Sequence, residues 1–414
     1  MKMKHNIKYA SIDTAATLLG LVLMLAGCGG GGGDTAAAPT RKALSVPVNL
    51  DDSNRISAGP DFTLALASNG MLYAWGGNTY GQLGTGDLSD ALTPIQVPGM
   101  SAVKALAAGG YHSAVLRTDG SVWNWGNNNF GQLGIGSYSE GAPTPRQVPG
   151  LSDVKGLSAG YTHTAVVLDD GTVWGWGSTP VKSSPVPVMV PELTNVKMIS
   201  AGSDFNLALK FDGSLWAWGG NIFGQLGNGK RSAMEAVPTP VLGLSGVASV
   251  AAGYVHGLAL KYDGTIWAWG GNTFEQLGSP GGNTSVARQV LGLPTPVYGG
   301  AAVRSVVAGT YNSAVVYADG SVWIWGSNLA GQFGDGTLNS SSVPVRISGL
   351  SAIVAVSLGD DFLVSLNNAG GGIGSGQNTR GQLGNNSRTD VTVSTPVLGL
   401  SGVGFLNLGR ASVP

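Results

Sequence analysis

From about residue 44 onward, short apolar runs alternate with turns that contain glycine. In one representative segment, apolar runs at 103–108, 111–116 and 121–126 follow one another closely. Asp119-Gly120 separates the last two runs, and this pair between two β-prone runs predicts a hairpin with a tight primed turn. No stretch has helical periodicity over ten or more residues. The pattern therefore predicts an all-β protein made of short strands.

The same segment recurs seven times, which identifies an internal repeat. Consecutive copies are 42 to 56 residues apart, measured between the glycines that end each Trp-Gly step or its degenerate equivalent: Gly76, Gly126, Gly177, Gly219, Gly270, Gly326 and Gly376. Most copies continue with a Gly-Gln-Leu-Gly turn, a variable loop and a fourth strand such as 145–148. Repeats of about fifty residues are typical of propellers and solenoids. Seven units of four antiparallel strands predict a seven-bladed β-propeller of four-stranded blades.

The two ends of the repeat region predict how the ring closes. The strand pair that precedes each Ala-Gly step occurs eight times, from 45–56 to 396–406, whereas the tryptophan hairpin occurs seven times. One terminal copy is therefore surplus. We expect a terminal strand to complete the blade begun at the opposite end, and the C-terminal copy fits the repeat better.

Tryptophan marks one strand of each unit. All eleven tryptophans fall in Trp-x-Trp-Gly strands or their one-tryptophan variant. Residues two apart on a strand face the same side, so these rings predict packing between blades. A sugar-stacking platform is the alternative. Unit seven carries Ile373 and Ser375 instead, and we expect its packing to be looser.

The N-terminal segment has the features of a targeting signal. Residues 1–27 contain a lysine-rich start and a short apolar run, and the sequence Leu-Ala-Gly-Cys at 25–28 resembles the lipobox of bacterial lipoproteins. We expect residues 1–27 to be a signal peptide, Cys28 to be lipidated, 28–43 to be a glycine-rich tether and 44–414 to form the propeller. A plain secretory signal with an incidental cysteine is the alternative.

Composition limits the classes of partner. Charged residues make up 11% of the chain and the net charge is -1, so no basic field for nucleic acid is present. Cys28 is the single cysteine, so no internal disulfide is possible. The 68 glycines recur at fixed places in each unit, which we interpret as turn chemistry.

Candidate catalytic groups have structural explanations. His112, His163 and His256 share one repeat position, which phenylalanine or asparagine occupies in other units, so we predict structural hydrogen bonds rather than a metal site or general base. The acidic pairs at 51–52, 169–170 and 360–361 are interpreted as turn or cap residues. No nucleophile elbow or metal motif is present. We predict no enzyme activity and no cofactor.

These motifs resemble the regulator of chromosome condensation repeat, a family pattern of a glycine, a His-Ser strand, a Trp-Gly strand, an Asn and a Gly-Gln-Leu-Gly turn. Residues 109–134 fit it nearly throughout, and the resemblance covers about residues 55–407. Unit three lacks the Gly-Gln-Leu-Gly turn, Glu275 replaces its first glycine in unit five, and unit seven has no tryptophan. The resemblance implies a seven-bladed propeller and does not fix one activity.

Function is expected on the variable loops, the longest of which is 279–294. Aromatic residues and arginine favour binding hot spots on such loops. The residues just before the Gly-Gln-Leu-Gly turn are therefore the candidate partner-binding residues; half-buried turn residues are the alternative interpretation. The candidates are Tyr80, Phe130, Phe223, Phe274 and Arg380.

We therefore expect a monomeric binding scaffold for an unknown protein partner, attached to the bacterial cell envelope by its N-terminal lipid. The outer membrane is favoured if the cell is Gram-negative, because Gly29 follows Cys28 where aspartate resembles an inner-membrane retention signal. The alternatives are a carbohydrate or cell-wall lectin and an inhibitor of an envelope or secreted enzyme, as in the family's β-lactamase inhibitor. The family's best-known activity, nucleotide exchange on a nuclear GTPase, does not suit an exported protein.

Overall fold

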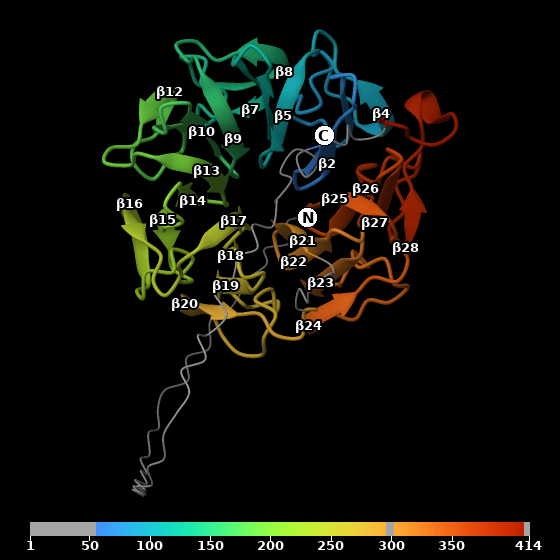
Figure 1. Ribbon diagram of the computed structural model, residues 1–414. Helices are drawn as coiled ribbons and strands as arrows, with labels where there is room; N and C mark the ends of the chain where they lie inside the picture. Colours follow the sequence, from blue (N-terminus) through green and yellow to red (C-terminus); the bar gives the residue numbers. More distant parts are fainter. Residues whose placement is uncertain (1–54, 295–301, 410–414) are drawn as a thin grey trace, which may run out of the picture. The chain divides into compact units, whose positions relative to one another are not determined.

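Seven four-stranded antiparallel sheets form a ring in the computed structural model, which describes residues 55–294 and 302–409 (Figure 1). This arrangement confirms the predicted all-β, seven-bladed propeller. The expected signal, tether and Cys28 lie outside the described residues. The short 3₁₀ turn η1 (Leu400–Gly402) is the helical element of the described part. Within those residues, no helix is long and apolar enough to cross a membrane.

Each blade is one contiguous stretch of chain whose strands pair in sequence order. The first strands of neighbouring blades contact one another near the centre of the ring (Figure 1). These inner strands are β1 (Ile56–Ala58), β5 (Val103–Ala108), β9 (Val154–Ala159), β13 (Val196–Ala201), β17 (Val247–Ala252), β21 (Val303–Ala308) and β25 (Ile353–Leu358). The second strands are buried along almost their whole length: β2 (Phe62–Leu66), β6 (His112–Arg117), β10 (His163–Leu168), β14 (Phe205–Lys210), β18 (His256–Lys261), β22 (Asn312–Tyr317) and β26 (Phe362–Asn367).

The third strands carry the tryptophans, and the fourth strands lie at the rim with mixed exposure (Figure 1). The third strands are β3 (Leu72–Gly76), β7 (Val122–Asn128), β11 (Val173–Gly177), β15 (Leu215–Asn221), β19 (Ile266–Gly270), β23 (Val322–Gly326) and β27 (Gly372–Gly376). The fourth strands are β4 (Ala91–Gln96), β8 (Ser139–Gln147), β12 (Ser184–Met189), β16 (Ser232–Pro240), β20 (Thr284–Gln289), β24 (Ser341–Arg346) and β28 (Val391–Pro396). Since β20 lies within residues 279–294, the expectation that this segment is one long loop was wrong.

The Asp-Gly hairpins are present, but their turn type differs from the prediction. In blade two, Gly120 N donates to Arg117 O and Arg117 N donates to Ser121 O. Gly120 has a φ of +79°, whereas Asp119 has no positive φ. This is the three-residue loop that ends in a left-handed glycine, not a two-residue primed turn. Asp119 instead accepts hydrogen bonds from the Ser121 amide and hydroxyl, at 3.0 and 2.6 Å.

Neighbouring blades are joined by an indole hydrogen bond. The Trp125 ring is fully buried beside residues of blade one, and its Nε1 donates to the backbone oxygen of Gln82 at 2.9 Å. This arrangement confirms that the tryptophans pack between blades. In unit seven the Ser375 hydroxyl replaces the indole and donates to Gln332 O at 3.0 Å. Equivalent indole bonds join Trp75 to Gln382, Trp176 to Gln132, Trp269 to Gln225 and Trp325 to Gln276.

The three histidines form a second set of contacts between blades. His112 is fully buried, and its Nε2 lies 2.9 Å from the Thr164 hydroxyl of the next blade. Because that hydroxyl donates its own proton to Gln132 O, the His112 Nε2 must be the donor. His163 and His256 make the corresponding contacts with Asn206 and Ser313. The interpretation of these histidines as structural agrees with this geometry.

The glycine of each Ala-Gly step is required by close packing rather than by turn geometry. An ideal Cβ on Gly109 would lie 2.2 Å from Cε1 of His112, and one on Gly59 would lie 2.1 Å from Cε1 of Phe62. Neither glycine has a positive φ. The interpretation of the recurrent glycines as turn residues was therefore wrong for this position, where the ring of the second strand lies against the backbone.

The C-terminal segment closes the ring through contacts with blade one. Among the described residues, every sheet contains strands of one contiguous stretch, so the C-terminal copy does not add a strand to the first blade. Instead, Leu406 and Leu408 share a core cluster with Ile56 and Trp75. The oxygen of Leu408 also accepts the Ser68 amide at 2.8 Å. Residues 45–54 lie outside the described part.

The indole bond predicts a measurable difference between two tryptophans. Trp125→Phe removes the donor to Gln82 O and should lower the free energy of unfolding by about 1 kcal/mol more than Trp218→Phe. Trp218 is the matched control, because it is equally buried but follows unit three, which has no equivalent glutamine. Urea unfolding of both variants measures the difference. Equal losses would show that only ring volume matters.

The buried histidines predict a loss of stability in acid. Burial, with a smaller effect of the His163 charge, lowers the pKa of His112 to about 3. The unfolded chain therefore binds a proton that the folded chain does not, and stability falls as pH decreases below about 6.5. His112→Phe, which copies Phe62 and Phe362, should remove about 2 kcal/mol of the stability difference between pH 7 and pH 5. Urea unfolding at both pH values tests this, and an unchanged difference would contradict it.

Candidate binding face

The Gly-Gln-Leu-Gly turns are held by two side chains of the repeat itself. In unit one, Asn78 Oδ1 accepts the Leu83 amide at 3.0 Å, and Gln82 Oε1 accepts the Tyr80 amide at 2.9 Å. Both side chains are fully buried. These two bonds fix the backbone of the turn that carries Tyr80. The same glutamine bond holds Phe130, Phe223, Phe274, Ala330 and Arg380.

Two of the predicted binding residues lie against other aromatic rings. The Tyr80 ring is 5.4 Å from that of Tyr111, and the Phe274 ring is 4.3 Å from that of Tyr311, measured between ring centroids. Both side chains are half-buried. Such pairs are stabilising beyond the area they bury.

Phe130 and Phe223 lie apart from these pairs. Phe130 is 50% exposed, which makes it the most accessible of the four candidate aromatics, and Phe223 is half-buried. Next to Phe223, Ile222 is 63% exposed. These residues therefore offer apolar contact points outside the two aromatic pairs.

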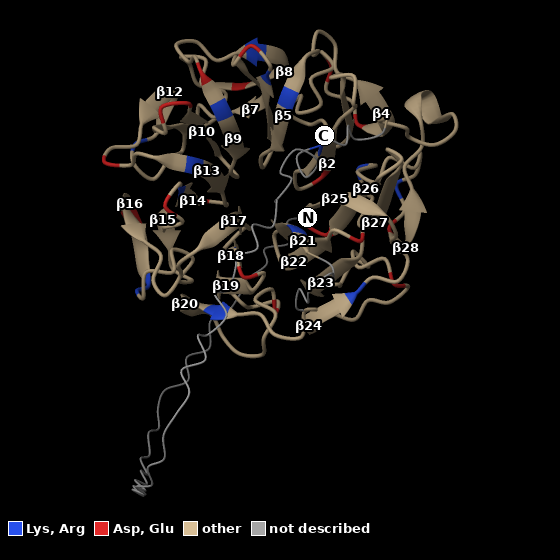
Figure 2. Cartoon of the chain, in the orientation of Figure 1, with Lys and Arg blue, Asp and Glu red and all other residues tan. Residues whose placement is uncertain are grey.

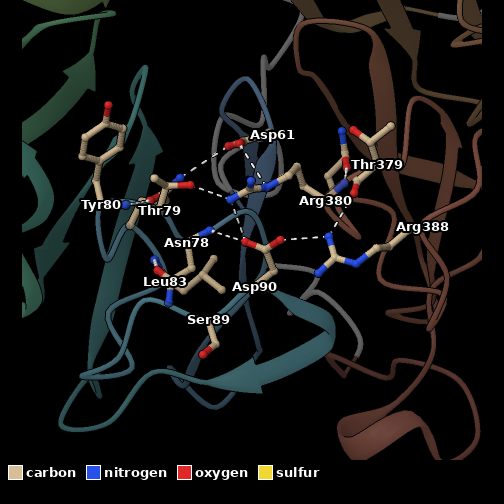
Figure 3. Close-up of polar contacts among 12 residues, drawn as sticks. Asp61, Asn78, Thr79, Tyr80, Leu83, Ser89, Asp90, Thr379, Arg380 and Arg388 are labelled. Carbon is tan, nitrogen blue, oxygen red and sulfur yellow. Dashed lines mark hydrogen bonds and ion pairs between the residues drawn. The ribbon is translucent and has the colours of Figure 1, made fainter.

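Arg380 lies at the junction of the last and first blades (Figure 3). Its guanidinium donates to Asp90 Oδ1 at 2.8 Å and to the Thr79 hydroxyl, and its Nε lies 3.9 Å from Asp61 Oδ2. Arg388 reaches the other oxygen of Asp90 at 2.9 Å. Arg380 thus has a structural role in joining blade seven to blade one, and its contact with a partner stays a prediction.

Sequence reasoning missed four tyrosines that connect the aromatic pairs. Ring centroids of Tyr111 and Tyr161, and of Tyr161 and Tyr254, are 5.8 Å apart, and Tyr254 lies 6.4 Å from Tyr311. Together with Tyr80 and Phe274 these rings form one chain of contacts, which we call the aromatic belt. The sequence signal that could have identified these tyrosines is the variable residue pair between each Ala-Gly step and the following strand.

Seven such pairs form the mouth of the central opening, and we call them the mouth loops. The first residue of each pair lines a cavity of about 110 Å³ together with the Ala-Gly residues, or the Leu-Gly residues in unit seven. Tyr161, Tyr254 and Asp360 are among the residues that line it. The mouth loops are Pro60-Asp61, Gly110-Tyr111, Tyr161-Thr162, Ser203-Asp204, Tyr254-Val255, Thr310-Tyr311 and Asp360-Asp361.

Carboxylates lie beside the belt in a poorly solvated environment. Burial raises the pKa of Asp360 despite a 2.6 Å hydrogen bond from the Thr310 hydroxyl. Burial and the neighbouring Asp360 raise the pKa of Asp361, and burial raises that of Asp61 although Arg380 opposes the shift. The turn interpretation holds for Asp170, which accepts the Thr172 amide. Asp360 also lies in a connection between strands, from β25 to β26, and there it contacts the neighbouring blade through Thr310. Residues 51–52 lie outside the described part.

Charge elsewhere is sparse. Lys, Arg, Asp and Glu are scattered around the ring, with some acidic segments near its centre (Figure 2). Within residues 55–294 and 302–409, no group of three or more His, Cys, Asp and Glu side chains is placed to hold a metal ion. The chemistry that this face offers is therefore aromatic contact, hydrogen-bond acceptance and local negative charge.

Comparison with known proteins identifies relatives of the whole propeller. Ultraviolet-B receptor UVR8 of Arabidopsis thaliana is 29% identical over 365 residues, which cover 86% of this chain and 71% of the receptor. E3 ubiquitin-protein ligase HERC2 of Homo sapiens is also 29% identical, but its match covers 78% of this chain and only 6% of the ligase.

Solved structures share the fold. Yeast RCC1 (Prp20), in its complex with Kap60, superimposes with a TM-score of 0.72 at 22% identity and covers 92% of both chains. Human WBSCR16 gives a TM-score of 0.70 at 21% identity, covering 83% of this chain and all of that one.

The repeat itself matches a family pattern over more than half of the chain. The Regulator of chromosome condensation (RCC1) repeat matches residues 69–116, 119–167, 212–260, 263–316 and 319–366. A second pattern of the same repeat matches 54–82, 103–132, 196–225, 247–276 and 303–332. The chain therefore belongs to the RCC1 repeat family.

Proposed function

We propose that this protein is a binding scaffold that presents the face carrying the Gly-Gln-Leu-Gly turns to a protein partner. The observation that carries the proposal is the way the turn displays its variable residue. The buried side chains of Asn78 and Gln82, and their equivalents, hold the backbone of the turn. The residue at the position of Tyr80 differs from unit to unit. Recognition by varied residues on a rigid support needs little ordering when the partner binds.

Relatives support a role in protein binding or regulation. Yeast Prp20 forms a complex with Kap60 and is described with binding properties to Gsp1p and histones. At 21–22% identity these proteins share the fold with our chain, so we carry over the class of partner and not its identity. The ligase activity of HERC2 is not carried over either, because the match spans 6% of that protein.

We further propose that the propeller is attached to the bacterial envelope through a lipid on Cys28. The support is in the sequence, where the single cysteine follows an apolar run at the position that a lipobox requires. The glycine-rich residues 28–43 would then act as a tether between the membrane surface and the propeller.

The face proposal predicts which aromatic residue matters. Phe130→Ala should reduce capture of the partner from envelope extracts by about tenfold, because truncation of an aromatic hot spot costs more than 1 kcal/mol. Phe211→Ala is the matched control, since Phe211 is 66% exposed and lies in the hairpin turn after β14, at the opposite end of the blade. Quantitative crosslinking with the full chain as bait measures the ratio. Equal capture by wild type and Phe130→Ala, or loss with Phe211→Ala alone, would refute this face.

The anchoring proposal has an independent test. Cys28→Ser should move the protein from the membrane fraction to the soluble fraction and abolish labelling with a radioactive fatty acid, because the thiol is the proposed acceptor. Fractionation and labelling of cells that express each form measure both effects. Persistent lipid labelling of Cys28→Ser would rule out this assignment.

A further inference from the structure

The mouth of the central opening combines an aromatic wall with an acidic wall. Tyr161 and Tyr254 meet edge to face with their planes at 89°, and both line the cavity. Asp360 lines the same cavity from blade seven. After burial, the Asp360 charge is the next largest influence raising the pKa of Tyr254 and of Tyr311, so the carboxylate lies within electrostatic range of the rings.

The backbone donors of the mouth loops are already used in contacts between blades. Gly110 N donates to Gly160 O, Tyr161 N to Ser203 O, and Ser203 N to Tyr254 O, each at 3.2 Å. Tyr254 N donates to Gly309 O at 3.1 Å. In four consecutive mouth loops, in blades two to five, the first amide is therefore already engaged and does not contribute to an anion-binding nest. What they leave available are ring faces and oxygen acceptors.

Asp360 has its hydrogen-bond capacity only partly filled. Within residues 55–294 and 302–409, its one side-chain donor is the Thr310 hydroxyl, on Oδ1, and no lysine or arginine forms an ion pair with it. A carboxylate oxygen accepts about two hydrogen bonds, so Oδ2 and part of Oδ1 remain available. Asp360 is half-buried, and a partly desolvated carboxylate in this state is stabilised by an arriving cation.

We propose that this mouth binds a cationic group, namely the guanidinium or ammonium of an arginine or lysine side chain that projects from a partner protein. The cation lies against the Tyr161 and Tyr254 rings and donates hydrogen bonds to Asp360. Attraction to ring faces and a charge-assisted hydrogen bond to a carboxylate are the two interactions that such groups prefer. The identity of the source as a protein rests on the proposed function.

The size and position of the cavity fit this ligand. Its volume of about 110 Å³ is below the ~150 Å³ that holds a benzene ring in an engineered cavity, and a guanidinium is smaller than benzene. The Ser203 and Thr310 residues that also line it carry hydroxyl groups that can accept further N–H bonds. Since the cavity lies at the centre of the same face as the displayed residues, one partner can reach both.

Small cationic probes test the site without any partner. We expect Nα-acetyl-arginine amide and Nα-acetyl-lysine amide to bind the full chain in a saturation-transfer NMR titration, and the neutral citrulline analogue to bind at least tenfold more weakly. This comparison requires no variant, so it is independent of folding defects. Equal binding of arginine and citrulline amides would overturn the proposal.

Variants then locate the site. Asp360→Asn keeps the acceptor for Thr310 but removes the charge, and it should weaken arginine amide binding by about ten- to a hundredfold. Asp212→Asn is the matched control, because it makes the same change of net charge in an exposed hairpin turn of the other face. Tyr254→Leu should weaken binding about fivefold, whereas Tyr254→Phe keeps the ring and the affinity. Binding that ignores Asp360→Asn, or falls equally with Asp212→Asn, would overturn the proposal.

The outcomes separate this inference from the proposed function. Absence of arginine amide binding, together with protein capture that depends on Phe130, refutes the cation site and leaves the scaffold. Binding that depends on Asp360, without any captured protein, supports the site and refutes the scaffold.

Discussion

The hydrogen bond from a buried indole to a glutamine carbonyl is the interaction on which both the ring and its face depend. Through its backbone oxygen, Gln82 receives the Trp125 indole of the next blade. Through its side-chain oxygen, the same residue receives the Tyr80 amide and sets the turn that displays Tyr80. Docking of one blade on the next therefore also fixes the position of a displayed residue. A repeat protein that varies its displayed residues needs such coupling, because each blade contacts little besides its neighbours.

Redundancy explains how the repeat tolerates its departures. The Gln82 oxygen also accepts the Ser113 hydroxyl at 2.7 Å, and the Gln382 oxygen accepts Thr63 in addition to Trp75. Where the indole is missing, Ser375 makes the bond to Gln332 alone. Junctions between blades thus retain a satisfied carbonyl after loss of one donor, which matters because an unsatisfied buried carbonyl costs about 1–3 kcal/mol. Blades that lose a tryptophan can therefore remain in the ring.

The sequence is sufficient to predict the fold because its signals are local and repeated. In most units, tryptophans two apart on a strand and Asp-Gly between strands define the hairpin without any knowledge of its neighbours. The candidate site depends instead on residues far apart in sequence. Tyr161 and Tyr254 meet across the intervening blade four, and Arg380 reaches Asp90 across the ring closure. The repeat pattern alone does not show that these two-residue loops lie around the central axis. The mouth loops were therefore not predicted from the sequence. The predicted turn type was wrong because Asp-Gly suits both kinds of loop. In the three-residue loop that forms, the Asp119 carboxylate accepts a hydrogen bond from the Ser121 amide.

The balance of charge determines how such a face can recognise a partner. With a net charge of -1 the protein has no strong long-range field, so association is not accelerated by steering at a distance. Discrimination must come from short-range contacts. In that setting a half-buried carboxylate beside aromatic rings favours the correct cation and penalises any partner that covers Asp360 without supplying a donor. The apolar residues displayed around the rim then supply contact area, while the acidic mouth at the centre determines which partner can use it.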